Sequence, residues 1–105
     1  MSESNGGEPP FKVGNLAAVP GQILSLAESA GQQGKLPQFL EIMKTAMGQL
    51  ERRPIAWGDP AYNLAHPGGI VYRALLAPIS FVYAVYSSER VVIILEVRQF
   101  AEYAP

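Results

Sequence analysis

Three apolar segments near the end of the chain limit its fold more than any other feature. They are Ile70–Ala77, Ile79–Tyr86 and Val91–Val97, and they are rich in Val, Ile, Tyr and Phe, the residues favoured in strands. Ala77-Pro78 separates the first two segments, and Ser87–Arg90 separates the last two. Connections this short join neighbouring antiparallel strands. The sequence therefore predicts a three-stranded antiparallel meander.

The expected turns also fix which side chains share a face of this sheet. Turns centred on Ala77-Pro78 and Ser88-Glu89 pair Arg73 with Val82 and Val82 with Leu95. One face is then predicted to carry Ile70, Tyr72, Ala74, Leu76, Ile79, Phe81, Tyr83, Val85, Val92 and Ile94. The other is predicted to carry Val71, Arg73, Leu75, Ser80, Val82, Ala84, Tyr86, Val91, Ile93, Leu95 and Val97. Both faces are mostly apolar, so both need cover.

Two helices are predicted before the meander. The first begins near Pro20, and Gly31 and Gly34 end it. The second begins near Pro37 and ends before Pro54. Its apolar stripe consists of Leu36, Leu40, Met43, Met47 and Leu50. The connection between the helices is short, so they should form an antiparallel hairpin on one face of the sheet.

The second helix is expected to supply most of the stability by packing on the sheet. If Leu40 and Met43 are buried there, Leu40→Ala or Met43→Ala should cost about 2–5 kcal/mol.

The remaining segments complete a single α+β domain over residues 11–105. Residues 1–10 are predicted to be a short disordered tail, and Phe11–Val13 a short strand. Pro54–Gly69 is predicted to be an ordered loop that Trp57 and Tyr62 anchor. The chain has 105 residues, which leaves no room for a second domain with its own core.

Charge and rare residue types exclude several function classes. Eight Lys and Arg against nine Asp and Glu give a net charge of −1, which disfavours tight non-specific nucleic-acid binding. The chain has no cysteine and one histidine, so disulfides, thiolate catalysis and multi-histidine or thiolate zinc sites are excluded. We therefore expect no metal and no cofactor. His66 is either a general base or an ordinary loop histidine.

The sequence predicts a cytoplasmic protein without a membrane span. The first residues lack the basic and apolar regions of a signal peptide. Gly69–Tyr86 carries one charge, that of Arg73, and approaches the length of a membrane-spanning helix. Pro78 and the β-branched residues of its second half favour two strands instead.

Four motifs resemble the RelE/ParE superfamily of bacterial toxins. They are Arg53–Pro60, Gly69–Arg73, Phe81–Tyr86 and Val91–Val97. These motifs are similar to that family's loop after the second helix, its Tyr-Arg strand, its Val-Tyr strand and its final apolar strand. The resemblance extends over Phe11–Tyr103. It implies a RelE/ParE-like fold with a short strand, a two-helix hairpin and a three-stranded antiparallel meander.

The resemblance also shows where the expected basic residues are missing. RelE-like ribonucleases hold mRNA with cations on the open sheet face, where these stabilise the charge that develops at the scissile phosphate. Here Tyr72-Arg73 is kept, but Leu75 and Ser80 stand where further basic residues are expected. The last arginine corresponds to Arg98, or to Phe100 by the simplest alignment.

No residue is therefore assigned a catalytic role. The candidates for binding RNA or a partner are Arg73, Arg98, Tyr103 and His66, with Tyr103 matching a late tyrosine of the family. Glu96 and Arg98, two apart on one strand, either pair with each other or act on a substrate. If the chain is an enzyme, the resemblance implies a metal-free endoribonuclease.

The favoured interpretation is a RelE/ParE-toxin-like protein that acts through protein–protein binding and lacks efficient mRNA cleavage. Leu75, Val82, Ile93 and Leu95 are predicted to form the interface, with a second copy or a cognate antitoxin-like protein as the partner. Nucleic acid or the ribosome is a less supported partner. The alternatives are an active toxin, either an mRNA interferase or a gyrase inhibitor, and a homodimeric interaction domain unrelated to toxins.

Overall fold

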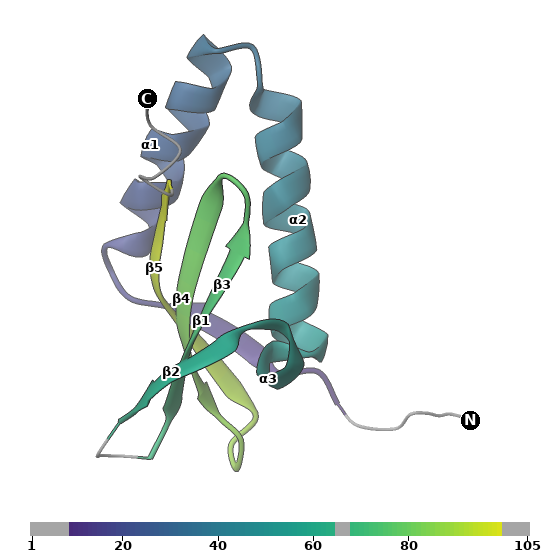
Figure 1. The fold of residues 1–105 in the computed structure, drawn as a ribbon, viewed down its shortest axis with the longest axis vertical. Coiled ribbons are helices and arrows are strands. Elements are labelled where there is room, and N and C mark those ends of the chain that lie inside the picture. Colours follow the sequence, from purple (N-terminus) through teal and green to yellow (C-terminus); the bar gives the residue numbers. More distant parts are fainter. Residues whose placement is uncertain (1–8, 65–67, 100–105) are drawn as a thin grey trace, which may run out of the picture.

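The computed structural model describes residues 9–64 and 68–99, and its strands form one sheet (Figure 1). In chain order the elements are β1 Lys12–Asn15, α1 Val19–Gln32, α2 Leu36–Arg52, α3 Pro54–Trp57, β2 Asp59–Asn63, β3 Ile70–Leu76, β4 Ile79–Tyr86 and β5 Val91–Gln99. The strand order in the sheet is β1-β5-β4-β3-β2. The predicted α+β class, the helical hairpin and the antiparallel meander are confirmed.

The early strand β1 lies at the edge of the sheet beside β5. It runs parallel to β5, with Lys12 opposite Val91 and Asn15 opposite Ile94. Parallel neighbours need a crossover connection, and here the helical hairpin and the rest of the sheet lie between the two strands in sequence. The Phe11 N–H donates to the Glu51 carbonyl at 2.8 Å, which joins the start of β1 to the end of α2.

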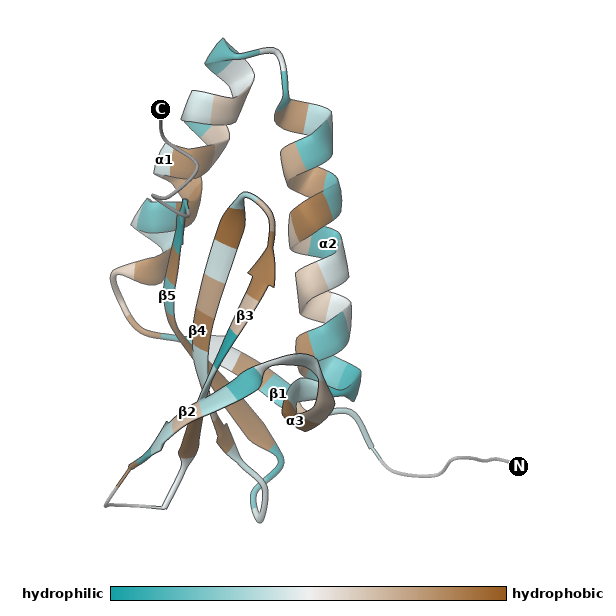
Figure 2. Cartoon of the chain, in the orientation of Figure 1, coloured by the Kyte–Doolittle hydropathy of each residue, from teal (hydrophilic) through white to brown (hydrophobic). Residues whose placement is uncertain are grey.

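Helices α1 and α2 cover one face of the sheet, where the core lies. The strands of the meander are hydrophobic over most of their length, and α2 carries hydrophobic residues along one side (Figure 2). The buried core consists of Phe11, Val19, Phe39, Ala46, Leu50, Tyr72, Ala74, Ile79, Phe81, Tyr83, Val85, Val92, Ile94 and Val97. Apart from Ile70, Leu76 and Val97, this agrees with the sheet face predicted to meet the helices.

The buried stripe of α2 differs from the predicted one at its first turns. Leu40 is 55% exposed and Met43 is only half-buried, whereas Phe39, Ala46 and Leu50 are buried. Phe39 and Leu40 are neighbours, so they cannot both face the sheet. The larger apolar surface of Phe39 takes the inward position, and the expectation that Leu40 is buried is wrong.

The predicted loop after α2 is regular over much of its length. Pro54 begins the short helix α3, which fits a proline at the first helical position. β2 then pairs antiparallel with β3, from Asp59 opposite Arg73 to Asn63 opposite Ile70. Its sequence, Asp-Pro-Ala-Tyr-Asn, contains residues that strands usually avoid, and its register shifts between Pro60 and Tyr62. The prediction of a loop was therefore wrong for this segment.

A β-bulge changes the register of β5. The predicted pairing of Arg73 with Val82 is confirmed, and Tyr83 pairs with Ile94. Beyond that point the register shifts by one residue, so Val82 pairs with Glu96 instead of Leu95. A bulge places two residues opposite one and leaves one of them unpaired. Val97, predicted to lie on the face away from the helices, is consequently in the core at 1% exposed.

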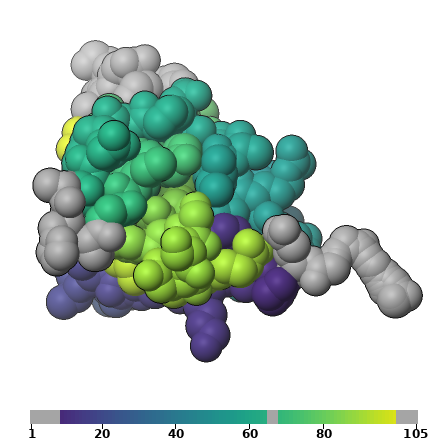
Figure 3. All heavy atoms as spheres, turned by 90° about the horizontal axis from the view of Figure 1, so that it is seen from below, coloured from purple at the N-terminus to yellow at the C-terminus, as the bar shows by residue number. Residues whose placement is uncertain are grey.

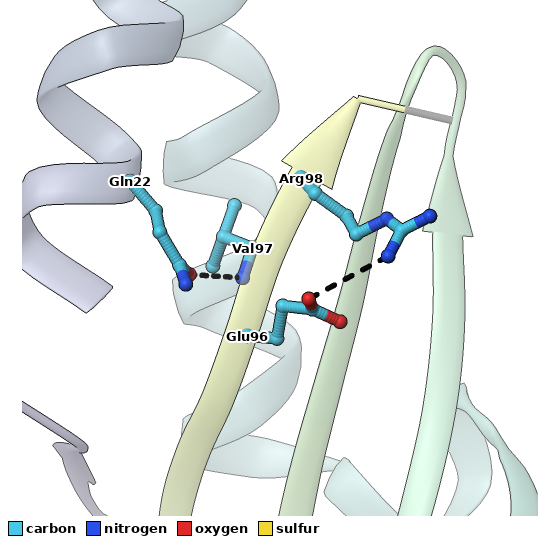
Figure 4. A network of polar contacts seen from close by, with 4 residues as sticks. All are labelled: Gln22, Glu96, Val97 and Arg98. Atoms are coloured by element: carbon cyan, nitrogen blue, oxygen red, sulfur yellow. Dashed lines mark hydrogen bonds and ion pairs between the residues drawn. The ribbon is translucent and has the colours of Figure 1, made fainter. Parts of the chain in front are cut away.

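A side chain from α1 completes the hydrogen bonding next to this bulge. β1 ends opposite Ile94, so it offers no partner to the part of β5 beyond that residue. The Val97 N–H donates instead to Gln22 Oε1 at 2.9 Å (Figure 4). Gln22 thus takes the place of a neighbouring strand at this position.

The turn between β4 and β5 fixes the beginning of the described chain. Arg90, whose φ is 55°, donates from Nε and Nη2 to the Pro9 carbonyl at 3.0 and 2.6 Å. Its guanidinium also lies 4.3 Å from the centre of the Phe11 ring. The turn packs beside the first residues of the described chain (Figure 3). In residues 9–64 and 68–99 no helix is long and apolar enough to cross a membrane.

Candidate functional site

The sheet face away from the helices is called the open face here. It is defined by Asp59, Arg73, Leu75, Ser80, Val82, Ile93, Leu95, Glu96 and Arg98. Residues directly opposite each other on neighbouring strands have side chains on the same face. The register therefore gives two rows across the sheet, Asp59–Arg73–Val82–Glu96 and Leu75–Ser80–Arg98.

The bulge in β5 is what brings the two candidate arginines to one face. Ile94 and Val97 both lie in the core, and Leu95 and Glu96 occupy the two positions between them. The shifted register then places Arg98 opposite Ser80, on the face that also carries Arg73. Without the shift, Glu96 and Arg98 would follow Ile94 on the helix face.

Arg98 forms an ion pair on the open face. Its Nη1 lies 3.6 Å from Glu96 Oε2, and the two side chains are 59% and 41% exposed. Figure 4 shows the pair on one side of β5 and Gln22 on the other. An exposed pair of this kind adds little to stability, about 0–1 kcal/mol. Its main effect is on the charge that the face presents.

Arg73 lines a hollow of about 550 Å³ at the border of the open face. Its walls also include Trp57, Asp59, Leu75 and Ser80. Asp59 lies directly opposite Arg73 on β2, and both side chains are exposed. Among the described residues Arg73 forms no ion pair, so its guanidinium remains available to a ligand.

An aromatic stack holds α3, and with it Asp59, against the sheet. Trp57 stacks on Tyr83 with ring centres 5.7 Å apart, and Tyr83 stacks on Tyr72 at 5.6 Å. The Tyr83 hydroxyl donates to the Pro54 carbonyl at 2.7 Å in a buried position. Burial raises the pKa of this hydroxyl well above its usual value.

Gly58 is required where the chain leaves this stack. A Cβ atom at Gly58 would lie 2.5 Å from the Tyr83 hydroxyl and 3.1 Å from the Arg73 carbonyl oxygen. The glycine therefore allows β2 to begin directly beside β3.

The predicted interface residues lie on the open face but differ in exposure. Leu75 is 44% exposed, whereas Val82, Ile93 and Leu95 are half-buried. Ile93 lies opposite Ala84, at the end of the face near β1, so it is separated from Leu75 by the row that contains Val82. Ile93 lies two residues before Leu95 on the same side of β5, so all four residues contribute to the apolar part of the face.

Other predicted candidates fall outside the part of the chain that the structure describes. These are His66 and Tyr103, together with Phe100, the alternative position of the last arginine. Sequence reasoning missed Asp59, since it lay in a segment predicted to be a loop. Within the described ranges, no three His, Cys, Asp or Glu side chains gather to hold a metal ion.

A second hollow, of about 440 Å³, lies on the helix side. It opens between α1, α2 and the turn that joins β3 to β4, and its apolar lining includes Leu26, Phe39 and Ile42. Lys35 is its charged lining residue. The lining also includes the hydroxyl of Ser29, and it contains no acidic residue or histidine.

No family model and no curated protein matches the sequence. Solved structures do match. The chain is similar to a chain of the toxin–antitoxin complex RelBE2 from Mycobacterium tuberculosis, with a TM-score of 0.63 and 19% identity over 86% of this chain and 98% of that chain. It is also similar to a chain of the archaeal RelE–RelB complex from Pyrococcus horikoshii, with a TM-score of 0.59 and 20% identity over 86% and 94%. The chain therefore has a RelE-like fold.

Proposed function

We propose that this chain is a RelE-toxin-like protein that binds an antitoxin-type partner protein on its open face and lacks efficient mRNA cleavage. The observation that carries the proposal is the chemistry of that face. It combines Leu75, Val82 and Leu95 with two arginines, and an acidic residue lies near each arginine.

The charge of the open face argues against strong phosphodiester chemistry. Stabilising the charge that develops at a scissile phosphate requires several cations, and each missing group costs a few kcal/mol of the barrier. Leu75 and Ser80 stand where the resemblance implies basic residues, and Ser80 is only 7% exposed. Arg98 is already paired with Glu96. Of the two arginines on this face, Arg73 is the one without an ion pair among the described residues.

The apolar part of the open face argues for a protein partner. Leu75 is 44% exposed, and it adjoins Val82 and Leu95. Burying side chains of this kind is the main source of affinity at the centre of a protein interface. The similar solved structures are toxin–antitoxin complexes, which favours an antitoxin-type protein over a second copy of this chain. Such a pair would act in the cytoplasm.

The test first asks whether the neighbouring gene encodes a small antitoxin-like protein, and then measures its complex with this chain by size-exclusion chromatography and calorimetry. Val82→Glu places a carboxylate at the centre of the apolar part of the face, so we expect affinity to fall at least about 100-fold. Leu24→Glu is the matched control, because Leu24 is a 61% exposed apolar residue on α1. It should bind like the wild type, and Arg73→Ala should leave the complex intact because rim charges contribute little.

Expression in bacteria tests whether the protein cleaves mRNA. We expect no transcript cleavage on translating ribosomes and no growth arrest. Growth arrest with new mRNA ends would identify an active mRNA interferase, and growth arrest with altered DNA supercoiling would identify a gyrase inhibitor. A stable homodimer that Val82→Glu dissociates, and that the neighbouring protein does not bind, would replace the antitoxin-type partner with a second copy.

A further inference from the structure

The open face carries two acidic residues, Asp59 and Glu96, beside its two arginines. Asp59 lies directly opposite Arg73 across the β2–β3 pair, and both line the same hollow. Glu96 is in ion-pair contact with Arg98 at 3.6 Å. Arg73 and Glu96 also lie at either side of Val82 in one row across the sheet. Each arginine therefore has a carboxylate as a near neighbour.

We infer that Asp59 and Glu96 determine the ligand specificity of the open face. Their carboxylates offset the charges of Arg73 and Arg98 and exclude polyanions such as single-stranded RNA in favour of a polypeptide. The inference rests on the proposed function, because it takes the open face as the binding surface. It goes further because it assigns ligand specificity to two acidic residues, which a search of the sequence for RNA-binding cations would not find.

Glu96 acts where an external anion would bind. A phosphate that approaches Arg98 must either displace the carboxylate or share the guanidinium with it. A second nearby negative charge also repels the phosphate directly. The bulge in β5 is essential here, because it turns Glu96 and Arg98 together onto the open face.

Asp59 has the same effect at the other arginine. The Asp59 backbone lies directly opposite that of Arg73, one strand spacing or about 5 Å away, so the two side chains share this face. The aromatic stack of Trp57 on Tyr83 holds α3, which ends immediately before the Gly58–Asp59 corner. Asp59 therefore lies on an anchored corner rather than on a free loop.

A polypeptide is not repelled in this way, because it can present charges of both signs to the face. Specificity arises from repulsion of the wrong ligand as well as from attraction of the right one. Rows that contain both signs of charge around Val82 are complementary to a protein surface with an apolar centre and mixed charges at its rim. A polyanion finds no matching surface.

The test measures binding of a fluorescein-labelled 12-nucleotide single-stranded RNA of mixed sequence. The main variant is the Asp59→Asn, Glu96→Gln double variant, which keeps side-chain size and removes both negative charges. At 50 mM KCl we expect it to bind about tenfold or more tightly than the wild type. Freeing Arg98 from its ion pair and removing the negative charge opposite Arg73 should steepen the salt dependence, by about 0.7 in the logarithmic slope for each phosphate contact.

A Glu28→Gln, Glu89→Gln double variant is the control for net charge. Both residues are exposed, on α1 and in the β4–β5 turn, and the variant has the same formal charge as the main one. We expect it to gain less than about threefold. Adding Arg73→Ala and Arg98→Ala to the main variant should abolish its gain, and circular dichroism should show native secondary structure throughout.

Two results would overturn the inference. One is a main variant that binds RNA no more tightly than the control variant, and the other is a gain that survives removal of both arginines. Binding of the neighbouring protein, measured in parallel, separates this inference from the proposed function. If the main variant gains RNA binding and the neighbouring protein does not bind, the inference about Asp59 and Glu96 stands and the proposed partner is rejected. If the neighbouring protein binds and the main variant gains no RNA binding, the proposed function stands and the inference about Asp59 and Glu96 is rejected.

Discussion

Tyr83 joins the core to the segment that positions the open face. Its hydroxyl donates to the Pro54 carbonyl at 2.7 Å, and its ring lies between those of Trp57 and Tyr72. The sequence placed this tyrosine on the helix face correctly, because alternation along β4 determines which way each residue points. It did not reveal the bond to Pro54, since that contact joins residues far apart in sequence.

Removing this hydroxyl should destabilise the protein measurably. Tyr83→Phe leaves the buried Pro54 carbonyl without its donor, so we expect the free energy of unfolding to fall by about 1–3 kcal/mol. Urea denaturation at neutral pH measures the change. Tyr62→Phe is the control, because Tyr62 is 55% exposed and its loss of a hydroxyl should change stability by less than about 0.5 kcal/mol. Equal effects of the two substitutions would contradict the role of the buried bond.

The same residue should make stability depend on alkaline pH. Burial raises the pKa of Tyr83 above the tyrosine value of about 10 that the unfolded chain has. Above about pH 10 the unfolded chain releases this proton while the folded chain keeps it, so stability falls as pH rises. The contribution is complete below pH 10. Tyr83→Phe should lack this component, so the stability difference between wild type and variant should shrink between pH 9 and pH 11.

At the scale of elements, α2 was predicted well in its bounds and less well in its orientation. Pro37 and Pro54 mark its ends clearly in the sequence. Its inward side was harder to predict because Phe39, Leu40, Ile42 and Met43 leave two adjacent apolar stripes. Only packing against the sheet decides between them, and Phe39, Ala46 and Leu50 are the residues that it buries.

A matched pair of leucines on α2 tests this orientation. Leu50 is fully buried, so Leu50→Ala should cost about 2–5 kcal/mol, which is a large part of the stability of a domain this size. Leu40→Ala removes the same atoms from a side chain that is 55% exposed, and we expect a cost below about 1 kcal/mol. Chemical denaturation of both variants measures the difference. A larger loss for Leu40→Ala would show that the helix is rotated toward the stripe predicted from the sequence.

The bulge in β5 and the irregular strand β2 explain why the candidate site was only partly predictable. Arg73 and Arg98 were identified from the sequence, and the meander placed Arg73 on the open face. Arg98 joins it only because of the bulge near Leu95, and a pattern of continuous apolar residues from Val91 to Leu95 gives no sign of a shift. Asp59 was missed because strand propensity is low in β2, which pairing with β3 nevertheless holds in place.

At the scale of the whole molecule, the β4–β5 turn holds the first described residues against the rest of the fold. Arg90 donates to the Pro9 carbonyl, and the neighbouring Phe11 is buried in the core. The overall fold was largely predictable because short connections and periodic apolar residues leave few arrangements for strands and helices. The predicted boundary between residues 10 and 11 remains a prediction.

A deletion and a point variant locate this boundary. Removing residues 2–8 should leave the midpoint of urea unfolding unchanged within error. Phe11→Ala in the full chain should cost about 3–5 kcal/mol, because it empties a buried aromatic site beneath Arg90. A deletion of residues 2–8 that costs more than about 1 kcal/mol would move the boundary of the folded unit toward the N-terminus.

The bulge in β5 also determines how this chain should be compared with related sequences. The extra residue at the bulge moves each later side chain of β5 to the opposite face of the sheet. A relative without the bulge would therefore carry its equivalent of Arg98 one residue closer to the β4–β5 turn. A gapless alignment through Leu95 would then match a core valine with a surface cation. Placing a single-residue gap at the bulge restores the correspondence, and a one-codon insertion or deletion there would be enough to exchange the chemistry of the two faces at the end of the strand.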